Sequence, residues 1–176
     1  MTVTEQQLED VDLYLARKDK QLTEPQPEWV DTGREDYQCT WSIIEMETGV
    51  ERSTLKLRIP FASFENPSVG LIFRGNPIAR LDRARDSVCE GNPPYATRLG
   101  LPYRVCGPHL HSWEHNRHHV ALTGLWELPA RVPITDNMSR LNQMFFWFCD
   151  KFSLMIPNNC RQLHLPDRGL FGDPNA

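Results

Sequence analysis

The stretch YQCTWSIIEME at residues 37–47, together with STLKLRIPF at residues 53–61, decides the fold. Both segments are rich in β-branched and aromatic residues, and in the second one apolar residues alternate with Lys56 and Arg58. The connection between them, TGVE, contains a glycine that is typical of a turn. We therefore expect a β-hairpin here.

Two further candidate strands follow this hairpin. They are VGLIFRG at residues 69–75 and PIARLDR at residues 77–83, and a short connection through Gly75, Asn76 and Pro77 joins them. Short connections of this kind link antiparallel neighbours. The sequence thus predicts a meander of four antiparallel strands.

A helix is expected on the N-terminal side of the meander. Residues 2–22 carry apolar side chains at helical spacing, and Thr4 with Gln7 has the spacing of a capping box. Pro25 and Pro27 then remove backbone donors and disfavour helix before them, so the helix should end ahead of these prolines.

A second helix is expected over residues 136–154, with Asp136 or Asn137 as its cap. Its apolar stripe consists of Leu141, Met144, Phe145, Phe148 and Phe152. Such a bulky stripe should cover one face of the sheet.

Between the meander and this helix, residues 86–100 have the composition of a loop, and residues 101–107, LPYRVCG, can form a fifth strand. The predicted fold is therefore α+β: an antiparallel sheet of about five or six strands packed against an N-terminal helix and an aromatic-rich C-terminal helix. We expect one domain over residues 1–176, comprising an acidic helical segment (1–35), a core of sheet and helix (36–165) and a loose tail (166–176).

Composition narrows the class of protein. The chain has 176 residues, of which 40% are hydrophobic and 24% charged, as is ordinary for one globular core. Asp150 and Lys151 interrupt the longest apolar cluster, so no membrane span is expected. Without a recognisable secretory signal, a cytoplasmic protein is the simplest expectation. The odd number of cysteines, with no CxxC pair, favours reduced thiols at Cys39, Cys89, Cys106, Cys149 and Cys160.

Charge is distributed unevenly along the chain. The net charge is -4, but residues 1–51 hold 13 acidic and 4 basic side chains, whereas residues 52–119 hold 10 basic and 5 acidic ones. Such a split is compatible with a phosphate-facing surface and an acidic segment that contacts a different partner.

Five of the six histidines lie in GPHLHSWEHNRHH, at residues 107–119. If PHLHSW is a strand, His109 and His111 project from the same face, roughly 7 Å apart, and Leu110 points into the core. Two neighbouring imidazoles suit a metal ion, and equally a general acid and base that flank a phosphodiester.

A helical alternative gives the same segment a different chemistry. In a helix that begins at Pro108, HSWEH matches H-x-x-E-H, the inverted zincin motif of zinc peptidases, through His111, Glu114 and His115. That motif needs a third ligand, and the only glutamate downstream, Glu127, is too close in sequence.

Two residues of an earlier strand favour the first interpretation. Arg80 and Asp82 occupy alternate positions in ARLDR, so both should face the same way. A guanidinium beside paired imidazoles can stabilise a phosphate, and Asp82 can orient an imidazole. Further candidate phosphate contacts are Arg74, Arg104 and Arg117.

With LIFRGNPIARLD and CGPHLHSWEH, the chain resembles a poorly characterised bacterial and prophage family that pairs an R-x-D strand with a later G-P-H-x-H strand. The resemblance covers roughly residues 40–150. The chain is also distantly similar to metal-independent ribonuclease toxins, and this similarity implies a site at Arg80, Asp82, His109 and His111. The overall acidity departs from that pattern, because toxins that bind RNA tend to be basic.

Two functions stay open at this level, and neither requires a metal or another cofactor. A third, metal-dependent version needs a ligand set that the sequence does not complete. The first is a protein of bacterial or phage conflict that binds a protein or nucleoprotein complex, for example a CRISPR-complex inhibitor or an antitoxin. Its acidic residues would imitate nucleic acid or dock on a basic partner: Glu5, Glu9, Asp10, Asp12 and Asp19. The second is a metal-independent ribonuclease that uses His109 and His111 as acid and base, with Arg80 as the phosphate clamp.

Overall fold

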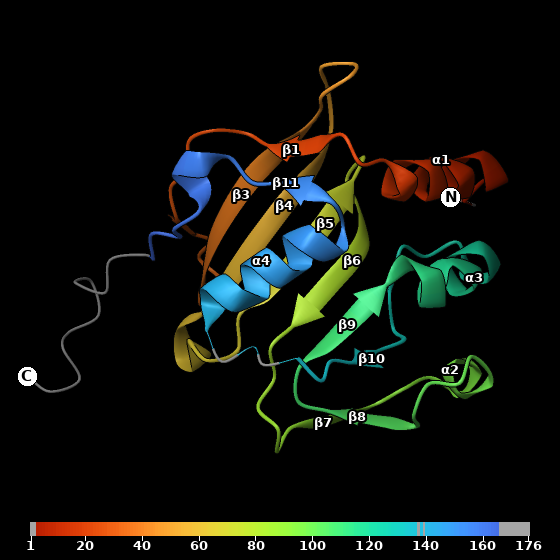
Figure 1. Cartoon of the computed structure of the whole chain (residues 1–176). Coiled ribbons are helices and arrows are strands. Elements are labelled where there is room, and N and C mark those ends of the chain that lie inside the picture. The colour runs from red at the N-terminus through yellow and green to blue at the C-terminus, as the bar shows by residue number, and fades with distance from the viewer. Residues whose placement is uncertain (1–2, 137, 139, 166–176) are drawn as a thin grey trace, which may run out of the picture.

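The computed structural model describes residues 3–136, 138 and 140–165, and it has a mixed α+β architecture (Figure 1). The helices of this part of the chain are α1 (Glu5–Ala16), α2 (Pro94–Arg98), α3 (Trp113–Thr123) and α4 (Leu141–Lys151), with short 3-10 turns at η1 (Phe61–Ser63) and η2 (Asn158–Cys160). Within the described residues, none of these helices combines the length and apolar character that crossing a membrane would require.

A large, mostly antiparallel sheet forms the centre of the molecule. Its strand order is β10-β9-β6-β5-β4-β3-β1-β11, β2 pairs with β3, and the β1–β11 pair is parallel. The strands are β1 (Lys20–Leu22), β2 (Val30–Asp31), β3 (Asp36–Glu45), β4 (Val50–Pro60), β5 (Ser68–Phe73), β6 (Asn76–Asp82), β9 (His109–Ser112), β10 (Val132–Pro133) and β11 (Leu154–Met155). The sheet is thus wider than the five or six strands expected, because short edge strands add to it.

The predicted meander is confirmed as β3, β4, β5 and β6, each antiparallel to the next. Alternation along β4 buries Leu55, Leu57 and Ile59 on one face of the sheet. On β3, Trp41 lies opposite Leu55 and is fully buried. This face carries the core, as the period-two pattern of the sequence indicated.

Helix α4 covers the core face of the sheet (Figure 1). Met144, Phe145 and Phe148 are fully buried, and the ring of Phe145 lies 5.3 Å from that of Trp41. The helix begins later than expected. Asp136 does not cap it but accepts a hydrogen bond from Trp147 Nε1 at 2.7 Å, while the other candidate cap, residue 137, lies outside the described residues.

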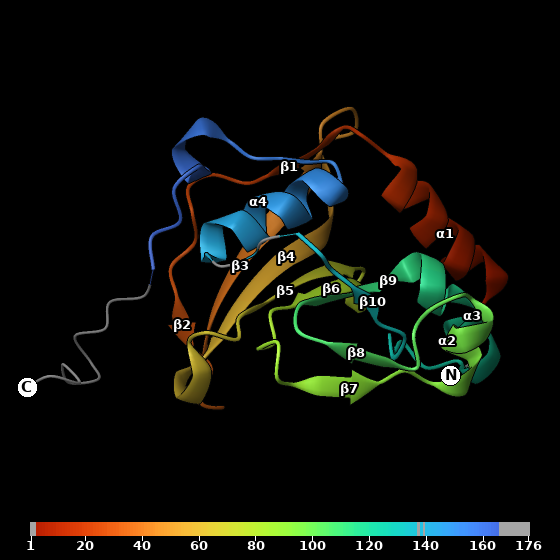
Figure 2. The ribbon, with the colours of Figure 1, turned by 60° about the horizontal axis from the view of Figure 1, so that its bottom comes forward.

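Helix α1 has the predicted capping box, in which Thr4 and Gln7 bond reciprocally. It packs beside α3 at one end of the sheet (Figure 2) and not flat on the sheet face. Tyr14 joins it to the meander: its hydroxyl lies 2.6 Å from Ser53 Oγ, and its ring stacks on Phe73 at 4.6 Å.

The buried Lys20 ties the end of α1 to the sheet and supplies a pH test. Its Nζ donates to the carbonyl of Tyr14 at 3.2 Å, and burial lowers the pKa of the amine to about 8. The unfolded chain keeps its proton up to about pH 10.4 and therefore binds more protons than the folded chain between pH 8 and 10. Lys20 therefore contributes a rise of about 2 kcal/mol in the free energy of unfolding over that interval. The buried thiols of Cys39 and Cys149, whose pKa is raised by burial, contribute a change of the opposite sign.

Chemical denaturation at pH 8, 9 and 10 measures this gain. The difference in unfolding free energy between the wild type and Lys20→Met should rise by about 2 kcal/mol from pH 8 to 10. The difference between the wild type and Lys18→Met, at an exposed neighbour, should stay constant. A difference between the wild type and Lys20→Met that stays constant or falls from pH 8 to 10 contradicts the prediction.

The segment after the meander corrects two expectations. Residues 86–100 are not a plain loop: they hold β7 (Cys89–Gly91) and α2, and β7 pairs with β8 (Arg104–Cys106) in a separate two-stranded sheet. The strand expected at residues 101–107 therefore exists as β8 but does not join the large sheet. The hairpin lies on the side of the sheet away from α4 (Figure 2).

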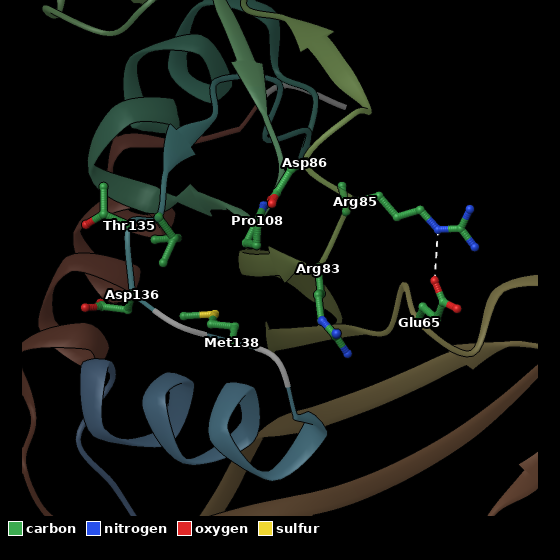
Figure 3. A pocket seen from close by; sticks show the side chains of 10 residues that line it. Glu65, Arg83, Arg85, Asp86, Pro108, Thr135, Asp136 and Met138 are labelled. Atoms are coloured by element: carbon green, nitrogen blue, oxygen red, sulfur yellow. Dashed lines mark hydrogen bonds and ion pairs between the residues drawn. The ribbon is translucent and has the colours of Figure 1, made fainter.

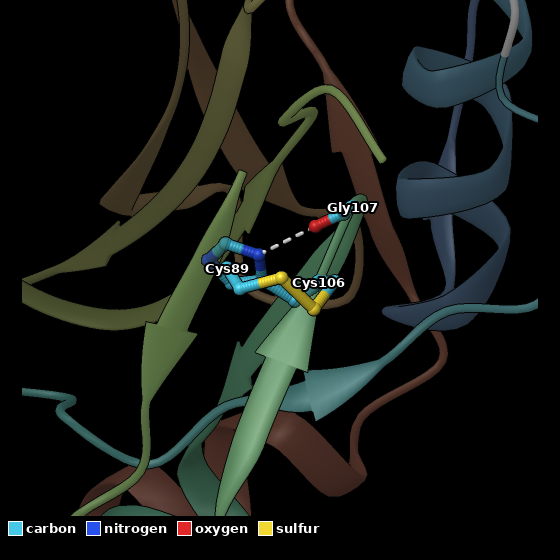
Figure 4. Close-up of a disulfide and its surroundings, with 4 residues drawn as sticks. Cys89, Cys106 and Gly107 are labelled. Atoms are coloured by element: carbon cyan, nitrogen blue, oxygen red, sulfur yellow. Dashed lines mark hydrogen bonds between the residues drawn. A yellow bond between two sulfur atoms is a disulfide. The ribbon is translucent and has the colours of Figure 1, made fainter. Parts of the chain in front are cut away.

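The expectation of five reduced thiols is wrong for two of them. Cys89 and Cys106 lie directly opposite each other in the β7–β8 hairpin and form a disulfide (Figure 4). The sequence hid this pair because the partners are 17 residues apart and no motif marks them. Cys39, Cys149 and Cys160 are free and buried.

The disulfide should contribute strongly to stability because it closes this loop in the unfolded chain. The double variant Cys89→Ser/Cys106→Ser is expected to lose about 3 kcal/mol of unfolding free energy. Urea denaturation measures the loss, and a reductant should destabilise the wild type by a similar amount while leaving the variant unaffected. Equal midpoints for the oxidised wild type and the variant would count against this role.

Candidate functional site

Strands β6 and β9 bring the four residues of the predicted site together. Their antiparallel register sets Arg80 opposite His111 and Asp82 opposite His109. Leu81 lies opposite Leu110, and both leucines are buried in the core. Since alternate residues of a strand face opposite ways, the four polar side chains share the sheet face that is turned away from α4.

The helical interpretation of this segment is wrong. His109 to Ser112 form a strand, and α3 begins only at Trp113, so His111 and His115 do not share a helix face. His115 instead bonds with the hydroxyl of Ser112 at 2.7 Å. The structure therefore provides no inverted zincin site at these residues.

The side chains converge on one carboxylate oxygen, Asp82 Oδ2. His111 Nε2 lies 3.1 Å from it, His109 Nε2 3.7 Å, and Arg80 Nε donates to it at 2.8 Å. The two imidazole rings are 5.1 Å apart, centre to centre. They thus meet at a single point and do not flank a gap in which a phosphodiester could lie between acid and base.

Backbone carbonyls fix which nitrogen of each imidazole faces the carboxylate. His109 Nδ1 donates to the carbonyl of Gly107 at 2.9 Å, and His111 Nδ1 donates to that of Leu128. A carbonyl only accepts, so each Nδ1 carries a hydrogen. In the neutral rings, each Nε2 therefore presents a lone pair toward Asp82.

Burial shapes the electrostatics of the site. His109 is 2% exposed and His111 1% exposed, whereas the side chain of Asp82 is 25% and that of Arg80 50% exposed. Desolvation lowers the pKa of His109, so its ring stays neutral near pH 7. Burial alone would raise the pKa of Asp82, but the hydrogen bond with His111 and the charge of Arg80 outweigh it and lower that pKa.

Two contacts at His111 Nε2 place incompatible demands on it. Arg80 Nη2, which can only donate, lies 2.9 Å away, and the ionised Asp82 Oδ2, which can only accept, lies 3.1 Å away. A lone pair on Nε2 satisfies the guanidinium and leaves two acceptors facing each other. A proton there satisfies the carboxylate and faces another donor.

The remaining predicted phosphate contacts lie outside this cluster. Arg74 pairs with Asp10, and Arg117 pairs with Asp12 at 2.8 Å and with Glu5 at 2.7 Å. These pairs fasten α1 to the β5–β6 turn and to α3. Arg104 is exposed and has no ion-pair partner among the residues that the structure describes.

Most of the acidic N-terminal residues also form ion pairs within the chain. Besides Glu5, Asp10 and Asp12, Asp19 forms a two-point pair with Arg17, which lowers the pKa of Asp19 to about 2. Of the five residues predicted to bind a partner, only Glu9 lacks such a contact within the described part of the chain.

A cavity of about 500 Å³ lies outside the candidate site, although some of its lining residues are chain neighbours of the site residues (Figure 3). Arg83, which follows Asp82, and Pro108, which precedes His109, both line it, together with Asp86 and Met138. Arg85 and Glu65 also line it and form an ion pair at 2.9 Å. None of the four clustered site residues lines this cavity, so it is a neighbour of the candidate site.

Sequence reasoning missed the groups that hold the site in place. Leu128 and Gly107 act through backbone carbonyls, which no sequence pattern reveals. Gly107 directly follows Cys106, so the disulfide anchors the carbonyl that orients His109 (Figure 4). Asn116 is fully buried and bonds to Ala130, two residues beyond Leu128.

Comparison with known proteins adds no assignment, since no family model, no curated protein and no solved structure matches this chain.

Proposed function

We propose that this chain is a phosphodiesterase that hydrolyses single-stranded RNA at the cluster of Arg80, Asp82, His109 and His111. One observation carries the proposal: a carboxylate and two lone-pair nitrogens converge beside a half-exposed guanidinium. The partly exposed carboxylate can activate water, and the guanidinium is the donor best suited to a phosphate.

The sheet face beside the cluster carries cationic side chains that suit an extended anionic substrate. Across β6, β5, β4 and β3, Arg80 is followed by Gly70, Lys56 and Thr40 in one hydrogen-bonded row. Gly70 leaves the floor between the two cations without a side chain, and a Cβ there would meet only the carbonyl of Ala79, at 3.7 Å. Lys56 has no ion-pair partner among the described residues and is available to a second phosphate.

In the proposed reaction, the oxygen of a water molecule forms a bond to phosphorus while the ester P–O bond breaks. The water gives up a proton to solvent, and the departing alkoxide takes one from solvent, so the reaction is a balanced hydrolysis. Arg80 binds the nonbridging oxygens, whose negative charge grows in the transition state. Asp82, whose carboxylate is partly exposed, lowers the cost of deprotonating the water.

Partner capture through the acidic N-terminal segment has less support from the geometry. Four of its five predicted residues are committed to contacts within the chain, as described above. These contacts give the acidity a structural role, because they join α1 to the rest of the molecule.

Cleavage of a labelled single-stranded RNA by the purified chain tests the proposal. We expect cleavage by the wild type and by Arg104→Met, and a loss of at least 100-fold in Arg80→Met. Arg104 is the matched control because it is an exposed arginine of the same chain outside the cluster. Cleavage that persists in a folded His109→Ala/His111→Ala variant, or no cleavage by the wild type with divalent ions supplied, would overturn the proposal.

A further inference from the structure

We infer that Asp82, His109 and His111 bind one divalent transition-metal ion, and we assign Zn²⁺ as the ion that fits best. The ligand atoms Asp82 Oδ2, His109 Nε2 and His111 Nε2 all lie within 4.8 Å of one another. They come from two adjacent strands, so the backbone ladder itself sets their spacing. The inference deepens the proposed function, because it names the group that would activate water at the same cluster.

Two of the three separations between the ligand atoms match a shared ion. Ligand atoms about 2.1 Å from a tetrahedral ion are about 3.4 Å from one another. The separations of Asp82 Oδ2 from His111 Nε2 and His109 Nε2, 3.1 and 3.7 Å, lie on either side of that value. The third separation, between the two Nε2 atoms, lies within 4.8 Å, so binding requires the two imidazoles to draw closer around the ion.

Both imidazoles are already held in the form that a metal requires. An ion binds the lone pair of one ring nitrogen, and in metal sites the opposite N–H usually donates to a carbonyl or carboxylate. Here the carbonyls of Gly107 and Leu128 receive the two Nδ1 hydrogens, so each Nε2 is free to coordinate. The same arrangement at two neighbouring histidines is difficult to explain by core packing alone.

An unpartnered atom provides independent support. His109 is 98% buried, and its Nε2 is completely shielded from solvent without any hydrogen-bond partner in the described structure. Leaving such a polar atom unsatisfied costs about 1–3 kcal/mol, so it normally has a reason. A cation between the three ligand atoms satisfies it.

The conflict at His111 is resolved by the same ion. Its Nε2 and Asp82 Oδ2 then both direct lone pairs at a positive charge, and neither needs a proton between them. Arg80 is half exposed, so its guanidinium can turn away from Nε2 toward the open sheet face and a bound phosphate.

The donor set selects the class of ion. Neutral imidazole nitrogens suit zinc and its neighbours in the first transition series, whereas calcium and magnesium prefer oxygen ligands only. Two histidines with one carboxylate leave a coordination position for water, as in catalytic zinc sites. At such a site the pKa of bound water falls to about 7, which supplies the nucleophile that phosphodiester hydrolysis needs.

Titration of the full-length, chelator-stripped chain with Zn²⁺ by calorimetry tests the site, and Co²⁺ with its visible absorption reports the ligand geometry. We expect one ion per chain and an affinity at least 100-fold weaker in His109→Ala and in Asp82→Asn. The matched control is His115→Ala, whose side chain bonds to Ser112 and lies outside the cluster. Because Asp82 is partly exposed, Asp82→Asn should fold even if the loss of the buried His109 side chain prevents His109→Ala from folding. The test then still stands on Asp82→Asn.

The outcomes separate the two proposals. No zinc binding by the wild type, or wild-type affinity in folded His109→Ala and Asp82→Asn, overturns the metal site. Stoichiometric zinc binding without RNA cleavage overturns only the proposed function. Cleavage at full rate by protein shown by elemental analysis to be metal-free overturns the metal site and leaves the phosphodiesterase intact.

Discussion

Asp82→Asn should reduce the rate of RNA cleavage by about 1,000-fold while leaving the fold intact. Asp82 is the point at which the cluster meets: both imidazoles and the guanidinium contact its Oδ2. The substitution removes the negative charge and keeps the size of the side chain. It therefore tests the electrostatics of the site, since the β6–β9 backbone register does not depend on this side chain.

The measurement is single-turnover cleavage of labelled RNA, with the far-ultraviolet circular dichroism spectrum as the check on folding. Asp150→Asn is the matched control, because Asp150 is an exposed carboxylate on α4, on the opposite side of the sheet. It should cleave at the wild-type rate. A folded Asp82→Asn variant that retains more than a tenth of the activity would show that the reacting groups lie elsewhere.

The core of this fold can be predicted from local pattern. Alternating apolar residues in β3 and β4 give both the strand assignment and the buried face, and the short connections leave an antiparallel meander as the simple outcome. The short strands β1, β2, β10 and β11 could not be found in this way. Each spans only two or three residues, and its pairing depends on distant partners.

Strand periodicity alone predicts which side chains of the site share one face of the sheet. The alternation in ARLDR and in PHLHSW placed four polar side chains on one face, and the register of β6 and β9 then set Asp82 beside His109. Periodicity could not show that both rings are almost fully buried or that carbonyls of Gly107 and Leu128 orient them. Those features depend on the β7–β8 hairpin and on the segment after α3.

The same limit explains why no metal site was expected from the sequence. Downstream of the histidine segment, Glu127 is the only glutamate that the sequence offers as a third ligand for the inverted zincin motif. The structure supplies Asp82 instead, from a strand 27 residues before His109. A ligand set that spans two strands becomes visible only once their pairing is known.

Asn116→Ala should destabilise the protein by about 3 kcal/mol and loosen the site as well. Asn116 is fully buried on α3, and its amide makes three hydrogen bonds to the backbone: Nδ2 donates to the carbonyls of Ser112 and Ala130 at 2.8 and 3.1 Å, and Oδ1 accepts from the N–H of Ala130 at 2.7 Å. Alanine leaves the carbonyl and the N–H of the buried Ala130 without these partners, at about 1–3 kcal/mol for each group that finds no water.

Urea denaturation measures the loss, and Tyr95→Phe is the matched control. The Tyr95 hydroxyl donates to the same Oδ1 at 3.1 Å but is only partly buried, so its removal should cost less than about 1 kcal/mol. Because Ala130 lies two residues from Leu128, whose carbonyl orients His111, we also expect Asn116→Ala to bind zinc more weakly than Tyr95→Phe does. Equal stability of the two variants would show that water replaces the Asn116 amide, and that the segment carrying Leu128 is held by other contacts.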